Sequence, residues 1–178
     1  YKRQVVHIES TEVGKLAEKM PDDLGAAVLL AAWCGLRFGE VIALDRADLA
    51  ADGSVVNVSK GYVRRGGVSE ISAPKSGRSR AVVTPPHIRA ALVEHLSQHV
   101  ATGPESPVFT DADGNRITEG KFRPSWHAAR DAIGRPTLRF HDLRHHAGMV
   151  AATAGATIAE SMARLGHSSP TMALHYAE

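Results

Sequence analysis

Residues 24–40 read LGAAVLLAAWCGLRFGE, and they predict the centre of the folded domain. Residues 24–34 are apolar on every side of a helix, which is the pattern of a helix buried in the middle of a protein. Gly35 breaks this run, and residues 38–44 are expected to form a second helical piece. Arg37 lies between the two pieces, so its charge would be held close to the hydrophobic core.

With 178 residues, the chain has the length of one compact domain. Hydrophobic residues make up 43% and charged residues 22%, which argues against disordered, collagen-like and low-complexity classes. Cys34 is the only cysteine, so an internal disulfide and a multi-cysteine zinc cluster are excluded and a reducing compartment is expected. The longest apolar stretch, residues 24–35, is too short for a membrane span, and no signal-peptide pattern opens the chain. We therefore expect an intracellular protein.

The pattern of the whole chain predicts an α+β domain in which helices dominate and one small antiparallel sheet has three strands. The strands are expected at residues 54–59, 68–73 and 80–84, which are rich in β-branched residues and joined by glycine-containing turns. Further helices are expected over residues 10–20, for about 15 residues after Pro85, from Thr118 to about residue 133, over about residues 141–153, from Thr157 to Gly166, and in a short last segment that contains Tyr176.

The net charge is only +2, but the charges are unevenly distributed. Residues 9–52 hold nine acidic and four basic side chains, whereas residues 60–89 hold seven Lys or Arg and one acidic residue. A second basic stretch, residues 121–146, has six Lys or Arg, two Asp and four His. Two such segments could line one face that binds a polyanion. Solvated surface charge is the alternative, and charge alone does not separate the two.

The motif GLRFGE at residues 35–40 combines an arginine with an acid at a structural break. Glu40 lies three residues after Arg37, which is close enough for its carboxylate to orient the guanidinium. Arg37 would then be a fixed cation suited to a phosphate. An ordinary surface ion pair has the same spacing and remains an alternative.

The motif HDLRH at residues 141–145 puts His141, Arg144 and His145 on one face of a helix. His141 and Arg144 could together bind two oxygens of a phosphodiester, with the fixed fork of the guanidinium as the better bidentate donor. A zinc site on His141 and His145 is a competing interpretation, but the glutamate that such metal hydrolases carry beside the first histidine is missing. His145 and His146 could equally be ordinary packing histidines.

Two further motifs belong to the same set. LGHSSP at residues 165–170 combines a helix end, a turn and a helix start, so His167 and Tyr176, nine residues later, could meet at one cleft. A tyrosine near a chain end is otherwise a packing residue. PKSGRSR at residues 74–80 is a tight basic turn between two strands, which could reach a backbone phosphate or could be a solvated loop.

Together these motifs resemble the catalytic domain of the tyrosine recombinases, the phage-integrase family, over nearly the whole chain. The order and the spacing of the matched residues make the resemblance specific. It implies the fold of that catalytic domain, with Glu40 as a supporting acid. Six residues match catalytic positions of the family: Arg37, Lys75, His141, Arg144, His167 and Tyr176.

The resemblance also implies a role for each matched residue. Tyr176 would be the nucleophile, and His141 would accept its proton. Lys75 would protonate the departing 5′ oxygen, with Lys60 as a rival for this role. The product would be a 3′-phosphotyrosyl DNA link with a free 5′ hydroxyl, formed without metal, ATP or cofactor. Three residues would neutralise the pentacoordinate phosphate: Arg37, Arg144 and His167.

The implied function is site-specific recombination of double-stranded DNA at attachment-type sites, with phage or prophage integration and excision as the expected setting. Four protomers would assemble on two synapsed DNA sites, whereas this domain alone would be monomeric. Tyr1 is not an initiator methionine and the chain stops two residues after Tyr176, so we expect residues 1–178 to be a single catalytic domain, a C-terminal fragment without the family's N-terminal core-binding domain. The expected location is a bacterial cytoplasm, in association with the nucleoid. Eight basic residues are expected to contact DNA: Lys60, Arg64, Arg65, Arg78, Arg80, Lys121, Arg123 and Arg139.

Other functions fit the sequence less well. A DNA-binding module that has lost catalysis would share the fold, but the set of matched catalytic positions is intact. A metal-dependent hydrolase using some of the ten histidines would be sensitive to chelators, whereas the recombinase interpretation needs no metal. A cofactor enzyme is disfavoured because no glycine-rich phosphate loop follows a strand.

Overall fold

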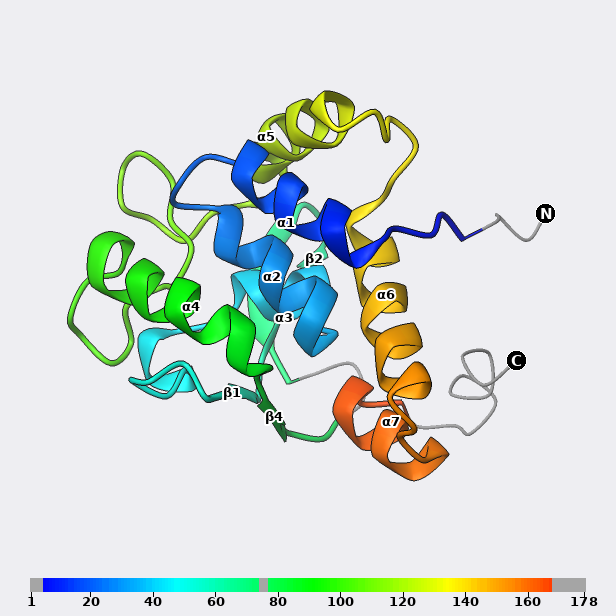
Figure 1. Cartoon of the computed structure of the whole chain (residues 1–178). Helices are drawn as coiled ribbons and strands as arrows, with labels where there is room; N and C mark the ends of the chain where they lie inside the picture. Colours follow the sequence, from blue (N-terminus) through cyan, green and yellow to red (C-terminus); the bar gives the residue numbers. More distant parts are fainter. Residues whose placement is uncertain (1–4, 74–76, 168–178) are drawn as a thin grey trace.

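The structure is a computed structural model that describes residues 5–73 and 77–167 (Figure 1). Its strands are β1 (Val55–Val58), β2 (Gly61–Arg65), β3 (Val68–Ser72) and β4 (Arg80–Val83). Its helices are α1 (Ser10–Lys19), α2 (Gly25–Cys34), α3 (Phe38–Ile42), α4 (Pro86–His99), α5 (Glu119–Ala132), α6 (Phe140–Thr153) and α7 (Ile158–Leu165), with a 3-10 turn η1 (Arg46–Asp48). The expected α+β fold, mainly helical with small antiparallel sheets, is confirmed.

Helix α2 lies at the centre of the domain, as its apolar sequence predicts. Helices α1, α4 and α6 pack against it, and α5 packs against α1 (Figure 1). Seven of its ten residues are buried, and the other three, Gly25, Leu29 and Trp33, are half-buried along one side of the helix. It ends at Gly35, whose φ of 71° is a left-handed conformation that glycine adopts without steric cost, and the Gly35 N–H donates to the carbonyl of Ala31.

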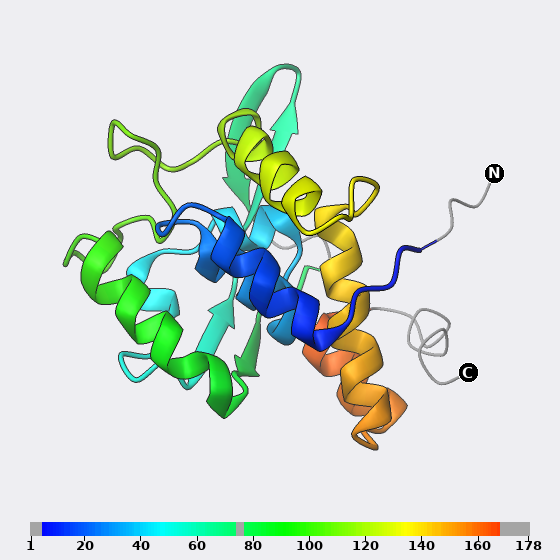
Figure 2. The ribbon, with the colours of Figure 1, turned by 45° about the horizontal axis from the view of Figure 1, so that its top comes forward.

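The described strands form two antiparallel pairs, which corrects the expectation of one three-stranded sheet. β1 pairs with β4, and Val56 lies opposite Val82 with both side chains buried. β2 pairs with β3 in a hairpin that projects from the domain (Figure 2). Its turn is Gly66-Gly67, with φ values of 56° and 84°, as a two-residue hairpin turn requires. β2 was not predicted because its residues, GYVRR, do not alternate between apolar and polar.

The remaining helices confirm the expected starts and stops within one or two residues. Thr118 caps α5 by accepting a hydrogen bond from the Lys121 N–H. Thr157 and Glu160 form a capping box at the start of α7, which ends at Gly166 with a φ of 63°. The expected last helix with Tyr176 lies outside the described residues. The longest helices of the described part have 14 residues, and none is long and apolar enough to cross a membrane.

Helices α6 and α7 bring the last motifs of the chain back to the middle of the domain. α6 packs along α2, and α7 contacts both α6 and β4 (Figures 1 and 2). The end of α2, the start of α3, the start of β4, the first half of α6 and the end of α7 therefore meet at one place. Each of these segments carries one of the motifs found in the sequence.

Candidate functional site

Arg37 lies at the start of α3, two residues after Gly35. Its backbone N–H donates to Glu40 Oε2 at 2.8 Å, and its guanidinium Nη1 donates to Glu40 Oε1 at 3.1 Å. The side chain of Glu40 is 3% exposed, whereas that of Arg37 is 27% exposed. The carboxylate thus holds the guanidinium from the protein side while part of Arg37 remains open to a ligand.

Arg144 is buried in α6 and joins two other motifs. Its Nη1 donates to the carbonyl of Gly35, and its Nη2 donates to the carbonyl of Leu165 at 2.5 Å. These carbonyls lie two residues before Arg37 and two residues before His167. Arg144 therefore fixes the backbone that presents each of these side chains, because a guanidinium can bind two acceptors in a defined plane.

His167 lies at the place where the arginines of the site come together. Burial, followed by the positive charges of Arg144, Arg37 and Arg80, lowers the pKa of His167 from 6.5 to about 4. Charges act on a pKa only over short distances, so the guanidinium groups of Arg144, Arg37 and Arg80 lie near this imidazole. The ring is neutral at pH 7 before DNA is present, so it would offer a hydrogen bond to a phosphate rather than a full charge.

His141 lies near the start of α6 with an exposed edge. Burial, together with the charges of His145 and Arg144, lowers the pKa of His141 to about 4. The rings of His141 and His145 meet edge to face, with centroids 5.1 Å apart. A neutral imidazole keeps the lone pair that accepting a proton requires. His146 faces the core instead, with Nδ1 at 2.9 Å from the carbonyl of Ala32, as a packing histidine does.

Arg80 at the start of β4 is used inside the protein, although the sequence predicts a DNA contact. Its Nη1 and Nη2 donate to the two oxygens of Glu40 at 3.0 and 2.9 Å, and its Nε donates to the carbonyl of Arg164 at 3.0 Å. The side chain is only 8% exposed. Burial alone would raise the pKa of Glu40, but hydrogen bonds from Arg80 and the charges of Arg80 and Arg37 hold it below the usual value.

Lys60 lies among acidic side chains. Its ammonium group binds the carboxylates of Asp45 and Asp48, the latter at 3.1 Å. Burial would lower the pKa of Lys60, but these two ion pairs outweigh it and raise the pKa. A lysine that holds its proton this tightly is a poor general acid, which favours Lys75 for that role. Lys75 and Tyr176 both lie outside the described residues.

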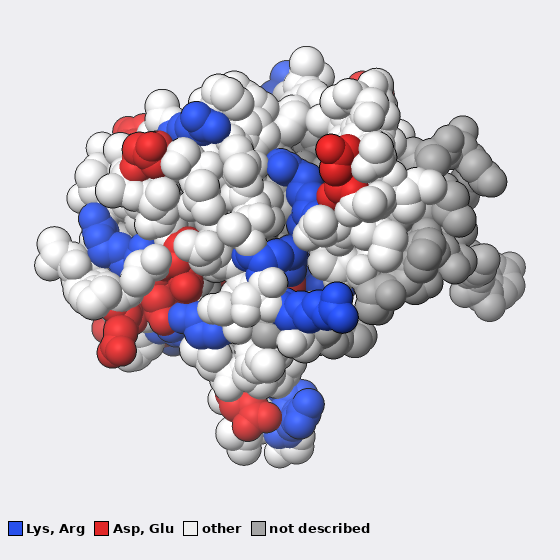
Figure 3. Space-filling view, turned by 90° about the horizontal axis from the view of Figure 1, so that it is seen from below, with Lys and Arg blue, Asp and Glu red and all other residues white. Residues whose placement is uncertain are grey.

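The remaining basic residues lie at the surface. Arg64 and Arg65 are exposed on β2, and Arg78 is exposed beside a cavity that His167 also lines. Figure 3 shows Lys and Arg side chains along the middle of one face of the molecule, beside a hollow. Lys121 is half exposed and pairs with Asp111 at 2.5 Å.

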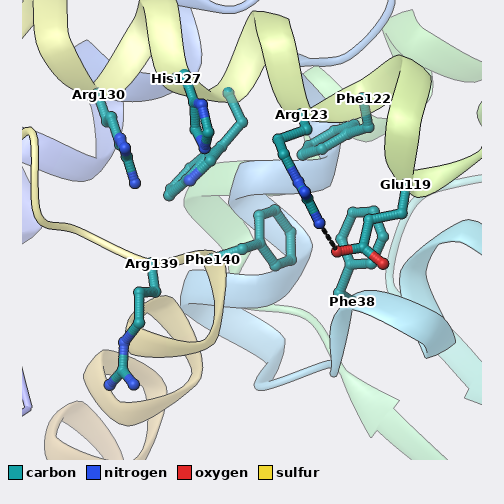
Figure 4. A pocket seen from close by; sticks show the side chains of 9 residues that line it. Phe38, Glu119, Phe122, Arg123, His127, Arg130, Arg139 and Phe140 are labelled. Carbon is teal, nitrogen blue, oxygen red and sulfur yellow. Dashed lines mark hydrogen bonds and ion pairs between the residues drawn. The ribbon is translucent and has the colours of Figure 1, made fainter. Parts of the chain in front are cut away.

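A second cavity, of about 470 Å³, lies between α5 and the start of α6 (Figure 4). Two of the expected DNA-binding residues line it, and both have carboxylate partners. Arg123 pairs with Glu119 at 2.6 Å, and Arg139 pairs with the buried Asp142 at 2.6 Å. The rest of the wall is formed by aromatic and basic side chains: Phe38, Phe122, Trp126, His127, Arg130 and Phe140.

The zinc interpretation finds no further ligands in the described part of the chain. Among residues 5–73 and 77–167, no group of three or more His, Cys, Asp or Glu side chains is arranged to hold a metal ion. Cys34 is buried in α2, and burial raises the pKa of its thiol to about 12. It is therefore a packing residue rather than a ligand or nucleophile.

Comparison with known proteins assigns the family. The model of the phage integrase family matches residues 7–178. The chain belongs to this family. The prophage phiRv2 integrase of Mycobacterium tuberculosis is 42% identical to this phage integrase domain over 168 residues, which are 93% of this chain and 45% of the relative. The integrase of Mycobacterium phage D29 is 37% identical over 179 residues, covering 98% of this chain and 48% of that protein. The chain thus spans about half the length of the curated relatives it matches.

Solved structures share the fold of this phage integrase domain. The Tn1549 transposon integrase in complex with a circular intermediate DNA superposes with a TM-score of 0.85 at 19% identity, covering 99% of this chain and 62% of that one. The XerA recombinase superposes with a TM-score of 0.75 at 21% identity, covering 97% of this chain and 60% of that one. The expected tyrosine recombinase catalytic-domain fold is confirmed.

Two arginines support the site from inside the protein. The sequence predicts Arg80 as a DNA contact rather than in this internal role. It does not single out Arg164, which donates to the carbonyls of Trp33 at 2.7 Å and Val83 at 3.1 Å. For Arg80 a signal was present, because it is two residues from the buried Val82 and side chains two apart share one face of a strand. For Arg164 the helical pattern gives no such signal.

Proposed function

We propose that this phage integrase domain cleaves and rejoins double-stranded DNA through a covalent phosphotyrosyl intermediate. The observation that carries the proposal is the convergence of three arginines on the segment of His167. Arg144 binds the carbonyls of Gly35 and Leu165, and Arg80 binds the carbonyl of Arg164 and shares Glu40 with Arg37. Three fixed cations around one neutral donor match the needs of a pentacoordinate phosphate, which carries extra negative charge in the transition state. Arg80 is largely enclosed, so Arg37 is the cation most open to the phosphate.

The proposed chemistry is one exchange of bonds at phosphorus. The Tyr176 oxygen attacks, a phosphorus–oxygen bond to tyrosine forms, and the bond to the 5′ oxygen breaks. His141, neutral at pH 7, accepts the phenolic proton, and Lys75 donates a proton to the departing 5′ oxygen. The negative phosphate would raise the low pKa of His141 once DNA binds, so the ring becomes a better base in the complex.

Rejoining reverses these steps with a second 5′ hydroxyl as the nucleophile. The phosphotyrosyl bond keeps the energy of the broken phosphodiester, so no ATP is needed. We further propose that the substrate is an attachment-type DNA site and that four protomers act on two synapsed sites, as part of phage or prophage integration and excision in the bacterial cytoplasm, in association with the nucleoid. The relatives support this setting, because they include a prophage integrase and a phage integrase.

A nicked suicide substrate tests the proposal. The intact protein is incubated with DNA whose cleavage releases a short fragment, so that rejoining is prevented and a covalent complex accumulates. We expect a slow-migrating protein–DNA band on a denaturing gel, which Tyr176→Phe abolishes while its DNA affinity is retained. Tyr62→Phe, on the β2 strand, is the matched control and should form the band normally.

Two results would contradict the proposal. A covalent band that persists in Tyr176→Phe would mean another nucleophile. Tight DNA binding without any covalent product from the wild-type protein would indicate a DNA-binding module that has lost catalysis.

A further inference from the structure

We propose that Arg80 is a positioning residue that keeps Glu40 from capturing Arg37, so that the Arg37 guanidinium remains available to the scissile phosphate. This inference rests on the proposed function and assigns a role to a residue that the sequence alone places among the DNA contacts. Its basis is the way in which two arginines share one buried carboxylate.

The four hydrogen bonds to Glu40 fill its acceptor capacity. Arg80 donates one bond to each oxygen, at 3.0 and 2.9 Å, and Arg37 donates one from its backbone at 2.8 Å and one from Nη1 at 3.1 Å. A carboxylate offers about four lone-pair positions, so no position remains for a second bond from the Arg37 side chain. Among the described residues, this is the only hydrogen bond that the Arg37 guanidinium makes.

Burial makes this division of the carboxylate important. Glu40 is 3% exposed, so water does not compete for its oxygens, and Arg80 is 8% exposed. If Arg80 were removed, two buried acceptors would lose their donors, which is costly in a dry site. Arg37 is the remaining arginine on Glu40, and a guanidinium and a carboxylate prefer a two-bonded fork. The Arg37 fork would then turn inward, away from a phosphate.

The place of Arg80 in the fold also supports a positioning role. Its Nε donates to the carbonyl of Arg164 at the end of α7, three residues before His167. A Cβ on Gly166 would lie 2.9 Å from Arg80 Nη1, so the glycine leaves the room that this side chain occupies. Arg80 thus links Glu40 and Arg37, at the start of α3, with the end of α7 that leads to His167.

Single-turnover cleavage at saturating DNA, measured with the intact protein and the suicide substrate, separates this role from a DNA contact. We expect Arg80→Met to cleave about 100-fold more slowly, the loss typical of removing one preorganised donor, with unchanged DNA affinity and salt dependence. Arg80→Lys keeps the fold and a cation beside Glu40. Its cleavage rate should fall about tenfold, because an ammonium cannot bind both carboxylate oxygens as a fork.

The decisive variant is the double substitution Arg80→Met with Glu40→Gln. A neutral amide does not capture Arg37, so the double variant should cleave at least about tenfold faster than Arg80→Met alone. Arg164→Gln is the matched control, because it loosens the same junction of α7 and β4 without touching Glu40. Adding Glu40→Gln to Arg164→Gln should restore nothing.

The inference is overturned if Arg80→Met and Arg80→Lys cleave at the wild-type rate, or if they weaken DNA binding with an unchanged rate at saturation, since the latter is a DNA contact. It is also overturned if the double variant is no faster than Arg80→Met, because Arg80 would then only stabilise the fold. Each of these outcomes leaves the proposed function standing. A wild-type protein without a covalent product overturns both together.

Discussion

Arg144 and Arg80 are cations whose donors bind the protein itself. Arg144 binds the carbonyls of Gly35 and Leu165, and Arg80 binds Glu40 and the carbonyl of Arg164. Burying a guanidinium costs desolvation energy, which good hydrogen bonds offset only in part. In exchange for this cost, the two arginines hold backbone segments that are far apart in the sequence in fixed positions around His167.

Burial and nearby positive charges make the histidines of the site sensitive to acid. The pKa values of His141 and His167 are lowered from 6.5 to about 4, mainly by burial. Between pH 6.5 and 4, the two histidines therefore bind protons more readily in the unfolded chain than in the folded one. As a result, these histidines do not reduce the free energy of unfolding above about pH 6.5, but they reduce it as the pH falls toward 4.

We therefore expect the free energy of unfolding to decrease as the pH is lowered from 6.5 to 4. Urea denaturation at a series of pH values measures this change. One proton contributes at most about 1.4 kcal/mol per pH unit. His167→Gln removes one such group, so its curve should be flatter than that of the wild-type domain. His127→Gln, a substitution of an exposed histidine on α5, should keep the wild-type slope. Equal slopes in wild type and His167→Gln would contradict the assignment.

At the level of elements, the end of α2 lies against the end of α7, and this contact shapes the site. Gly35 ends α2 with a φ of 71°, and a Cβ at this position would lie 2.3 Å from Cδ2 of Leu165. A side chain at Gly35 would force the buried Leu165 to shift and would hold a left-handed conformation that favours glycine. The close approach lets Arg144 reach the carbonyls of both elements from one position in α6.

Gly35→Ala should therefore destabilise the domain by about 3 kcal/mol, the sum of left-handed strain and overpacking. Gly14→Ala is a fitting control, because Gly14 lies on the exposed side of α1 with no atom near the added methyl group. It should stabilise the domain by up to about 1 kcal/mol, since alanine favours helix. Thermal or urea denaturation measures both changes. A Gly35→Ala domain as stable as wild type would show that α7 is not held as closely as described.

Across the whole molecule, the basic side chains differ in how far acidic neighbours already neutralise them. Arg64 and Arg65 are exposed on the projecting hairpin, whereas Lys60 is bound to Asp45 and Asp48. A charge with a carboxylate partner gains less from a phosphate, because the existing pair must first be broken. The basic side chains of the domain are therefore not equally available to DNA.

The salt dependence of DNA binding should reflect this difference. A phosphate contact contributes about 0.9 to the slope of log affinity against log salt, so Arg64→Ala combined with Arg65→Ala should reduce the slope by up to about 2. Lys60→Ala should change the slope little and lower the stability instead, because Asp48 loses its lysine partner and Asp45 keeps only Arg116. Fluorescence anisotropy over a salt series measures the slopes. A larger slope change in Lys60→Ala than in the hairpin variant would refute this ranking.

The sequence by itself determined the helices, their ends and the family. The apolar run of α2, the box of Thr157 and Glu160 and the glycines that end α2 and α7 act through contacts within a few residues, so local patterns predict them. The order of GLRFGE, HDLRH and LGH then identified the catalytic domain. The β2 strand was missed because its hairpin is stabilised by pairing and turn geometry rather than by an alternating buried face.

Only the tertiary structure decided what each cation does. Arg80, Lys60 and Arg64 are alike in the sequence, each a basic residue in one positive stretch. In the folded domain, Arg80 is enclosed by Glu40 and the end of α7, Lys60 lies between two aspartates, and Arg64 faces water. The role of a charge depends on its burial and on its nearest opposite charge, and both are set by residues distant in the chain.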